Sequence, residues 1–418
     1  MTNKSTFSLS EDWVVVILGF LSIVAILSGL DIAVPVYNWN DFSELQENVV
    51  SLPNLGKIAL IFLVMLVVAL LGGWLLKRLT SSWLGGFVVL YLLTTLALIL
   101  TGNAWVRSLN LESVIVSLGL GLLISNLFRV PEWLRAVLST ELYVKIGLIL
   151  LGTNVIFGDI LKAGILGLVQ ALVVVILVWY FAYWISRKWK VDQEMSVMLA
   201  SAVSICGVSA AIATSGAIKG DGKKLSYVIS LVLITAIPMM IGMPYLAKWM
   251  GLSQEVTGAW LGGTIDTTGA VVASGSLVGE AALKISTIVK FSQNVLLGVA
   301  AFAISVYWSY MRTEKDSSAD LKPTLGVIWN RFPKFVLGFV AASLLCSFVV
   351  KPEVLAEVKG SFKYLQSVWF TLAFTSIGLE TRFRDLFNKE NQRPLYAFLV
   401  AQLFNVVVTL VMARVLFG

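Results

Sequence analysis

Residues 204–216 read SICGVSAAIATSG and residues 264–275 read TIDTTGAVVASG. The two segments align at a constant offset of 60 positions, and each lies in a run of apolar and small residues. Gly207 and Gly269 allow a tight backbone approach at the point where each run is interrupted. We therefore predict two broken helices whose tips, Cys206-Gly207-Val208-Ser209 and Asp266-Thr267-Thr268-Gly269, face one site.

The composition places these segments in a membrane. The chain has 418 residues, of which 58% are hydrophobic and 13% charged, with a mean hydropathy of +0.88. Many runs are long enough to cross a hydrocarbon layer of roughly 30 Å. The isoelectric point near 9.3 reflects Lys and Arg in short loops, which set topology rather than bind nucleic acid. Because the chain has no histidine, coupling to protons would require a carboxylate or a lysine.

The fold class predicted is an all-α polytopic membrane protein with about eleven transmembrane helices and two re-entrant or broken helical hairpins. The start of the chain lacks the cleavage pattern of a secretory signal, so the first apolar run is expected to stay as a helix. The predicted spans are 13–30, 55–76, 87–100, 113–128, 142–157, 165–185, 225–249, 285–310, 332–350, 368–379 and 395–416.

The distribution of basic residues predicts the topology. By the positive-inside rule the N-terminus and the basic loops, including the loop from Arg312 to Arg331, are expected to be cytoplasmic. If 195–218 crossed the membrane, Lys219, Lys223 and Lys224 would face outside. If this run and 257–279 instead enter and return, each from its own side, the charge bias is kept throughout. Arms of about 10 residues reach roughly half the bilayer.

A second internal match predicts an inverted repeat. Pro131-Glu132 with Leu134 recurs as Pro352-Glu353 with Leu355, and Gly152, Phe157 and Asp159 recur at the same spacing as Gly378, Phe383 and Asp385. We predict N-terminal scaffold helices in 1–110 and a transport region in 111–418, in which 113–185 pairs with 332–417 and 195–249 with 257–310. Inverted repeats with broken helices at the midplane are typical of secondary transporters. The plainer alternative is that small residues only allow close helix packing.

The strings ICGVSAAIA and GGTIDTTGAVVASG, followed by Lys290, resemble the YeiH-like putative sulfate exporter family of bacterial inner membranes. The resemblance covers about Glu112 to the C-terminus and implies an integral membrane anion transporter. Members of that family often carry an arginine just after the lysine that matches Lys290, where this chain has Gln293-Asn294.

The tips also predict an anion site on physical grounds. The second arm of each hairpin begins with unpaired N–H groups and the positive end of a helix dipole. Hydroxyl groups nearby can bond an oxyanion without adding charge, although hydroxyls in membrane helices often bond only their own helix carbonyls. The candidate substrate-binding residues are Ser204, Cys206, Gly207, Val208, Ser209, Thr264, Asp266, Thr267, Thr268, Gly269, Lys290 and Asn294.

Several roles are compatible with the charged and amide side chains in and around the hairpins. Asp266, the only charge in either hairpin, could carry a coupling proton, bind a coupling cation, pair with Lys290 or cap the second arm. Lys290 could bind substrate or reach to the interface. Asn154 and Glu380 occupy matched repeat positions and are candidate coupling residues, with an interfacial ion pair as the alternative for Glu380. Cys206 reads as a small packing residue. The amides Gln170, Gln293, Asn294, Gln402 and Asn405 are expected to bond between helices.

The function predicted is secondary active transport of a small anion such as sulfate or a sulfonate, coupled to protons or Na⁺. A monovalent cation/proton antiporter is the alternative, and an anion channel is a weaker one. An enzyme is not expected, because the chain has no His, HExxH or P-loop motif. No cofactor, metal or nucleic acid is expected. Membrane lipids are partners, and a homodimer is compatible with the architecture.

Overall fold

The computed structural model describes residues 10–30, 32–108, 113–218, 220–312, 329, 332–381 and 392–418. These residues are helical throughout their regular structure and contain no strand, with one isolated bridge between Trp39 and Asn103. The chain divides into two compact units, each built from separate stretches of sequence. The first unit comprises Met1–Phe157 and Lys334–Arg382, and the second comprises Gly158–Pro333 and Phe383–Gly418. The predicted assignment of 1–110 as scaffold and 111–418 as transport region stays a prediction.

The first unit is a bundle in which long helices alternate with short ones. Two of its short elements are π-helical turns, labelled η. Its elements are α1 (Glu11–Leu27), α2 (Phe42–Glu44), η1 (Leu45–Val49), α3 (Leu52–Leu75), α4 (Trp83–Gly102), α5 (Ala104–Ser108), α6 (Ser113–Leu127), α7 (Glu132–Arg135), α8 (Thr140–Gly152), α17 (Lys334–Leu344), η2 (Leu345–Val349) and α18 (Pro352–Glu380).

Glycines set the closest helix contacts of this unit. A Cβ added at Gly378 of α18 would lie 2.8 Å from the Cα of Gly121 in α6. A Cβ added at Gly152 of α8 would lie 2.5 Å from the carbonyl oxygen of Phe339 in α17. The predicted repeat pairs α6 with α17 and α8 with α18. Under that pairing, the contact of α18 with α6 corresponds to the contact of α8 with α17. Small residues at such points let helix backbones approach closely.

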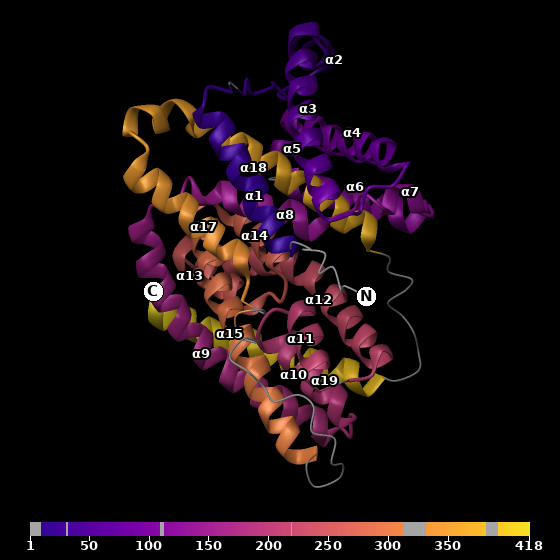
Figure 1. Ribbon diagram of the computed structural model, residues 1–418, viewed down its shortest axis with the longest axis vertical. Coiled ribbons are helices and arrows are strands. Elements are labelled where there is room, and N and C mark those ends of the chain that lie inside the picture. Colours follow the sequence, from indigo (N-terminus) through magenta and orange to yellow (C-terminus); the bar gives the residue numbers. More distant parts are fainter. Residues whose placement is uncertain are drawn as a thin grey trace, which may run out of the picture. The chain divides into compact units, whose positions relative to one another are not determined.

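The second unit contains the two look-alike segments and the helices around them. It comprises α9 (Phe157–Lys188, from its second residue), α10 (Gln193–Ser204), α11 (Val208–Ile218), α12 (Gly222–Trp249), α13 (Gln254–Thr264), α14 (Thr268–Val278), α15 (Glu280–Arg312) and α19 (Gln392–Phe417). Figure 1 shows the short helices α10, α11, α13 and α14 among the long helices α12, α15 and α19, which pack against them.

Each look-alike segment forms a helical hairpin whose two ends lie together. At the base of the first, Lys224 near the start of α12 bonds Asp192 at 2.7 Å and Glu194 at 3.2 Å. The chain therefore leaves α11 beside the point where it entered α10. At the base of the second, a Cβ at Gly279 would lie 2.5 Å from the Gln254 Oε1 atom, so α14 ends beside the start of α13. Both segments are therefore helical hairpins, and their re-entry in a membrane stays a prediction.

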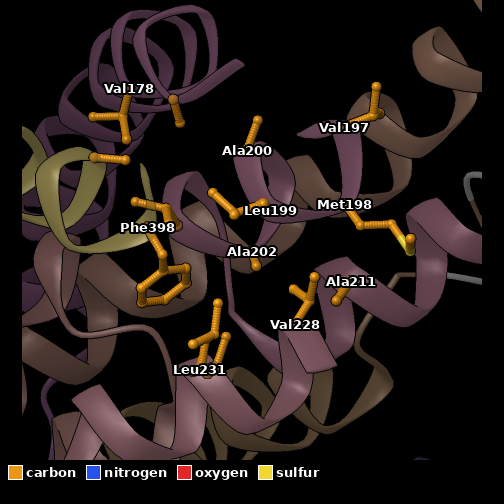
Figure 2. Close-up of a cluster of buried hydrophobic side chains, with 14 of the residues drawn as sticks. Val178, Val197, Met198, Leu199, Ala200, Ala202, Ala211, Val228, Leu231 and Phe398 are labelled. Carbon is orange, nitrogen blue, oxygen red and sulfur yellow. The ribbon is translucent and has the colours of Figure 1, made fainter. Parts of the chain in front are cut away.

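An apolar core surrounds the first hairpin. Figure 2 shows Val197, Met198 and Leu199 of α10 among side chains from neighbouring helices, including Val228 of α12 and Phe398 of α19. All of these are buried. From Ser196 to Ser204 every residue of the first arm is buried, as expected of a helix that lies among other helices rather than at the protein surface.

All eleven predicted spans coincide with helices. Six of the described helices are long and apolar enough to cross a membrane: α3, α4, α9, α12, α15 and α19. The largest difference in bounds is at α18, which begins at Pro352 rather than at the predicted residue 368. Its first turns carry Glu353, Glu357, Lys359 and Lys363, so an apolar-run criterion placed the start too late. The predicted basic loop 312–331 and Lys219, Phe383 and Asp385 lie largely or wholly outside the described residues.

We expect Gly262→Val to destabilise the protein. A Cβ at Gly262 in α13 would lie 2.5 Å from the Ser286 carbonyl oxygen in α15, which is backbone and cannot rotate away. Overpacking of this kind costs about 1–3 kcal/mol, measurable as a lower melting temperature in detergent. The matched control is Gly242→Ala in α12, where nothing lies within 4 Å of the added atom. Equal melting temperatures for both variants would contradict the α13–α15 contact.

Candidate functional site

The two hairpin tips meet. α10 ends at Ser204 and α11 begins at Val208, and α13 ends at Thr264 and α14 begins at Thr268, so the breaks keep the offset of 60. Gly207 has φ +58, a conformation that favours glycine. A Cβ there would lie 3.1 Å from the Asp266 Cβ atom. The structure thus brings together the tips that the sequence predicted to face one site.

Two amide side chains, one on α15 and one on α19, each donate hydrogen bonds to both first arms. Gln293 of α15 donates through Nε2 to the Ser204 carbonyl at 2.8 Å and to the Gly263 carbonyl at 3.2 Å. Asn405 of α19 donates through Nδ2 to the Val203 carbonyl at 3.1 Å and to the Thr264 carbonyl at 3.2 Å. Each amide therefore bonds the last turn of both first arms, where helix carbonyls have no partner of their own. We name this arrangement of α10, α13, Gln293 and Asn405 the crossing.

Lys290 is buried at the end of α10. Its side chain is 1% exposed, and Nζ donates to the Ile205 carbonyl at 2.7 Å and to Gln293 Oε1 at 2.8 Å. An ammonium is favourable at this place because the C-terminal end of a helix is the negative end of its dipole. The ion pairs between described residues do not include one from Lys290 to Asp266. The lysine thus bonds the hairpin backbone rather than reaching an interface.

The second arms begin differently in the two hairpins. Thr267 caps α14, since its Oγ1 accepts from the Ala270 N–H at 3.3 Å. The cap proposed as one role for Asp266 is therefore made by its neighbour. The matching position before α11 is Gly207, which has no side chain to cap with, and the first helical bond runs from Ala211 N–H to the Gly207 carbonyl. The N–H groups of the first turn of α11 are thus left for another acceptor.

A hollow lies beside that first turn. It has a volume of about 380 Å³ and is lined by Ser209, Ile212, Ala213 and Leu297. Ser209 is exposed, in contrast to the buried Ser204 at the end of α10. The combination of a helix N-terminus, a hydroxyl and an apolar wall is suited to a small anion with an apolar part.

Asp266 is buried at the tip of the second hairpin, 2% exposed. Lys290 and Gln402 are neighbouring groups that act on its charge. Its Oδ2 atom has no hydrogen-bond partner among the described residues. The same holds for four further buried oxygens near the tips: Ser204 Oγ, Thr264 Oγ1, Asn294 Oδ1 and Gln402 Oε1.

The other predicted site residues divide between the two units. Cys206 is buried at the first tip, and Thr268 accepts a hydrogen bond from Asn294 at 3.3 Å. Asn154 and Glu380 belong to the first unit. There Asn154 donates to Gln366 at 3.4 Å, and Glu380 accepts from the Thr140 hydroxyl at 3.1 Å. Their coupling role stays a prediction.

The amides predicted to bond between helices do so with the hairpins in particular. Besides Gln293 and Asn405, Gln402 donates to the Thr264 carbonyl at 3.1 Å and Gln170 donates to the Ala259 carbonyl at 2.8 Å. Polar amides on apolar helices were the signal in the sequence. Their role at the crossing was missed, because nothing in the sequence indicated which carbonyls they would reach.

The helices and the buried crossing define a polytopic membrane protein. Residues 85–397 match the family model described as Conserved hypothetical protein 698, and the chain belongs to this family. The match covers most of the chain, including both hairpins and Lys290.

Relatives in this family come from several bacteria. The chain is 42% identical to a UPF0324 membrane protein of Rhodopirellula baltica over 348 residues, 81% of this chain and 63% of the relative. It is 37% identical to one of Nitratidesulfovibrio vulgaris, covering 80% and 60%, and 28% identical to one of Nitrosomonas europaea, covering 93% and 92%. The chain thus spans less than two thirds of the first two relatives. Their names specify a membrane protein and no substrate. No solved structure matches the chain.

We expect Gln293→Met to lower stability strongly. The change removes the donor to the Ser204 and Gly263 carbonyls and one of the two acceptors of the Lys290 ammonium. Each buried polar group left without a partner costs about 1–3 kcal/mol. The melting temperature of the purified variant measures the loss. The control is Val299→Leu on the same helix, whose side chain is 51% exposed and should change little. A Gln293→Met protein as stable as the control would show that the crossing does not depend on this amide.

The base of the first hairpin predicts a pH dependence. Burial alone would raise the pKa of Asp192, but hydrogen bonds from Lys224 and from the Met195 N–H lower it below its ordinary value. Because the folded-state pKa is depressed, the stabilisation is present above the unfolded pKa of about 3.9 and is lost as pH falls through the folded pKa.

The test compares thermal stability of the native protein and Asp192→Asn between pH 6 and the lowest pH that both tolerate. The difference between the two should shrink as the pH falls below about 4. At neutral pH it should be about 1 kcal/mol or less, since Lys224 and Asp192 are part-exposed. A difference that stays constant with pH would contradict the ion pair.

Proposed function

We propose that this chain is a secondary active transporter of a small anion, such as sulfate or a sulfonate, and that its two hairpins are re-entrant in a bacterial inner membrane. The observation that carries the proposal is the crossing, where two interrupted helices meet tip to tip around a buried ammonium and a buried carboxylate. Broken helices that meet at the midplane of an inverted repeat are a feature of secondary transporters. A buried charge pair without catalytic partners fits transport better than chemistry.

The anion is proposed to bind at the first turn of α11. Its N–H groups are uncapped by Gly207, Ser209 adds a hydroxyl, and the adjacent hollow of about 380 Å³ gives room. Lys290, bonded to Ile205 in the same tip, supplies positive charge nearby. The resemblance of the tip motifs to the sulfate exporter family supports an anion of this class.

Alternating access is preferred over a continuous pore. The ends of α10 and α13 are closed by Gln293 and Asn405, and the tips are in contact, so the crossing is a packed plug rather than a lined channel. The matching breaks at an offset of 60 and the paired glycine contacts of α18 on α6 and α8 on α17 support the inverted repeat. We propose rigid-body movement of the hairpin-bearing helices, with coupling to protons or Na⁺.

Topology is tested by cysteine labelling in a background with Cys206 and Cys346 replaced by alanine. In the proposed topology a cysteine at Lys223, at the base of the first hairpin, is cytoplasmic, whereas one at Trp249, at the other end of α12, faces outside. A membrane-impermeant maleimide added to intact cells should label Trp249→Cys and leave Lys223→Cys unlabelled until the cells are opened. Labelling of Lys223→Cys from outside would overturn the re-entrant topology.

Anion binding is tested by thermal stabilisation of the purified protein and by counterflow of radiolabelled sulfate in vesicles. A ligand that binds the folded state raises the melting temperature with its concentration. We expect one class among sulfate, sulfite, thiosulfate, small sulfonates and carboxylates to do so, with an affinity at least about tenfold lower in Lys290→Met because a bond to a charged group is lost. Lys284→Met, on the same helix and paired with Glu280, is the control. Stabilisation by cations alone would favour the antiporter.

A further inference from the structure

The carbonyl groups at the ends of α10 and α13 have different hydrogen-bond donors, although the two ends occupy matched positions in the sequence. The carbonyl of Ile205, which directly follows α10, accepts a hydrogen bond from the Lys290 ammonium at 2.7 Å. The last turn of α13 receives only neutral amides, from Gln293 to Gly263 and from Gln402 and Asn405 to Thr264. At the offset of 60, the position that matches Lys290 is Ser230. The negative end of the α13 dipole therefore has no fixed cation from α12.

Unpartnered oxygens gather at that same end. Thr264 Oγ1, Asp266 Oδ2 and Gln402 Oε1 are buried without a hydrogen-bond partner among the described residues. Thr264 and Asp266 are separated by one residue, and the Gln402 Nε2 atom donates to the Thr264 carbonyl at 3.1 Å and to Met239 Sδ at 3.2 Å. Ser204 Oγ, also unpartnered, lies across the crossing, where Gln293 joins Ser204 to Gly263.

The orientation of the amide is fixed by its partners. Gln402 must turn its NH₂ group toward the Thr264 carbonyl, which only accepts, so its Oε1 atom is the one left over. Carboxylate and amide oxygens have no proton to offer each other, and the two hydroxyls bond neither. A cation placed between these four oxygens would give each of them a partner, whereas leaving such groups buried and unpaired costs about 1–3 kcal/mol each.

We propose that Na⁺ binds at the α13 end of the crossing, liganded by Thr264 Oγ1, Asp266 Oδ2, Gln402 Oε1 and Ser204 Oγ. The inference rests on the proposed transport function, in which Na⁺ is then the coupling ion. An all-oxygen set suits a hard cation, and a single carboxylate suits a monovalent one, since divalent sites use more carboxylates. Ends of interrupted helices are where transporters hold such ions. In the described residues no group of three acidic, Cys or His side chains offers an alternative metal site.

The experiment measures the melting temperature of the purified full chain in NaCl, KCl and choline chloride at equal ionic strength, with no other added ligand. Na⁺ should stabilise in a saturable way, and K⁺ and choline should not. In Thr264→Val the apparent affinity for Na⁺ should fall at least about tenfold, as expected for loss of one ligand to a charge. Ser204→Ala is the second variant, so that poor folding of one does not prevent the test.

The matched control is Thr235→Val in α12. Thr235 is also buried, but its hydroxyl already donates to the Leu231 carbonyl of its own helix at 3.0 Å, so Na⁺ affinity should be unchanged. Equal stabilisation by Na⁺ and K⁺, or affinities unchanged in both Thr264→Val and Ser204→Ala, would overturn the site.

An anion titration carried out in K⁺ and then in Na⁺ separates this inference from the transport proposal. Anion binding and counterflow that are independent of Na⁺ would leave the transporter standing and overturn Na⁺ as its coupling ion. Saturable Na⁺ binding that depends on Thr264, without any anion response or flux, would confirm the cation site and contradict anion transport.

Discussion

Backbone carbonyls at the broken ends of α10 and α13 are the constraint on which the second unit depends. A helix that stops in a buried place leaves its last four carbonyls without partners in the helix, and burying them unpaired is costly. Here the donors come from side chains on α15, which directly follows the second hairpin, and on α19, which is far from both hairpins in sequence. The long helices therefore position the hairpins by hydrogen bonds as well as by apolar packing.

The donors must also lie close to these carbonyls, and glycines of α13 allow α15 to pack closely enough. Gly258 and Gly262 of α13 lie against Ala282 and Ser286 of α15, where an added Cβ would meet backbone oxygens at 2.7 and 2.5 Å. This close approach brings the Gln293 amide within reach of carbonyls in both first arms. The small-residue packing that the sequence offered as an alternative to a site is thus also a condition for it. Close helix packing is seen at Gly258 and Gly262, and the site begins at the end of the same arm, at Gly263 and Thr264.

The sequence predicted the hairpins well because their signal is local. Gly207 and the Asp266-Thr267 pair mark both breaks, and the constant offset of 60 survives in the helix bounds. All eleven apolar runs became helices for the same reason. The partners at the crossing could not be predicted, since Gln402 and Thr264 are 138 positions apart and a single sequence does not report such contacts. The early start of α18 was missed because its first turns are charged. Capping was left as one of several open roles of Asp266, and the structure gives the cap to Thr267.

The charge balance at the crossing links the proposed ligands to one another. Asp266 and Lys290 carry opposite charges and are both buried, so the site without ligands is neutral. Na⁺ alone would add a positive charge to a region of low dielectric constant, and an anion alone would add a negative one, each at high cost. Bound together, one Na⁺ and one monovalent anion restore neutrality. Under the proposed function the ligand-free and doubly loaded states would cost least to move through the membrane, and electrostatics would couple the two ligands. A divalent anion such as sulfate would leave one negative charge, which a second cation or a proton on Asp266 would have to offset.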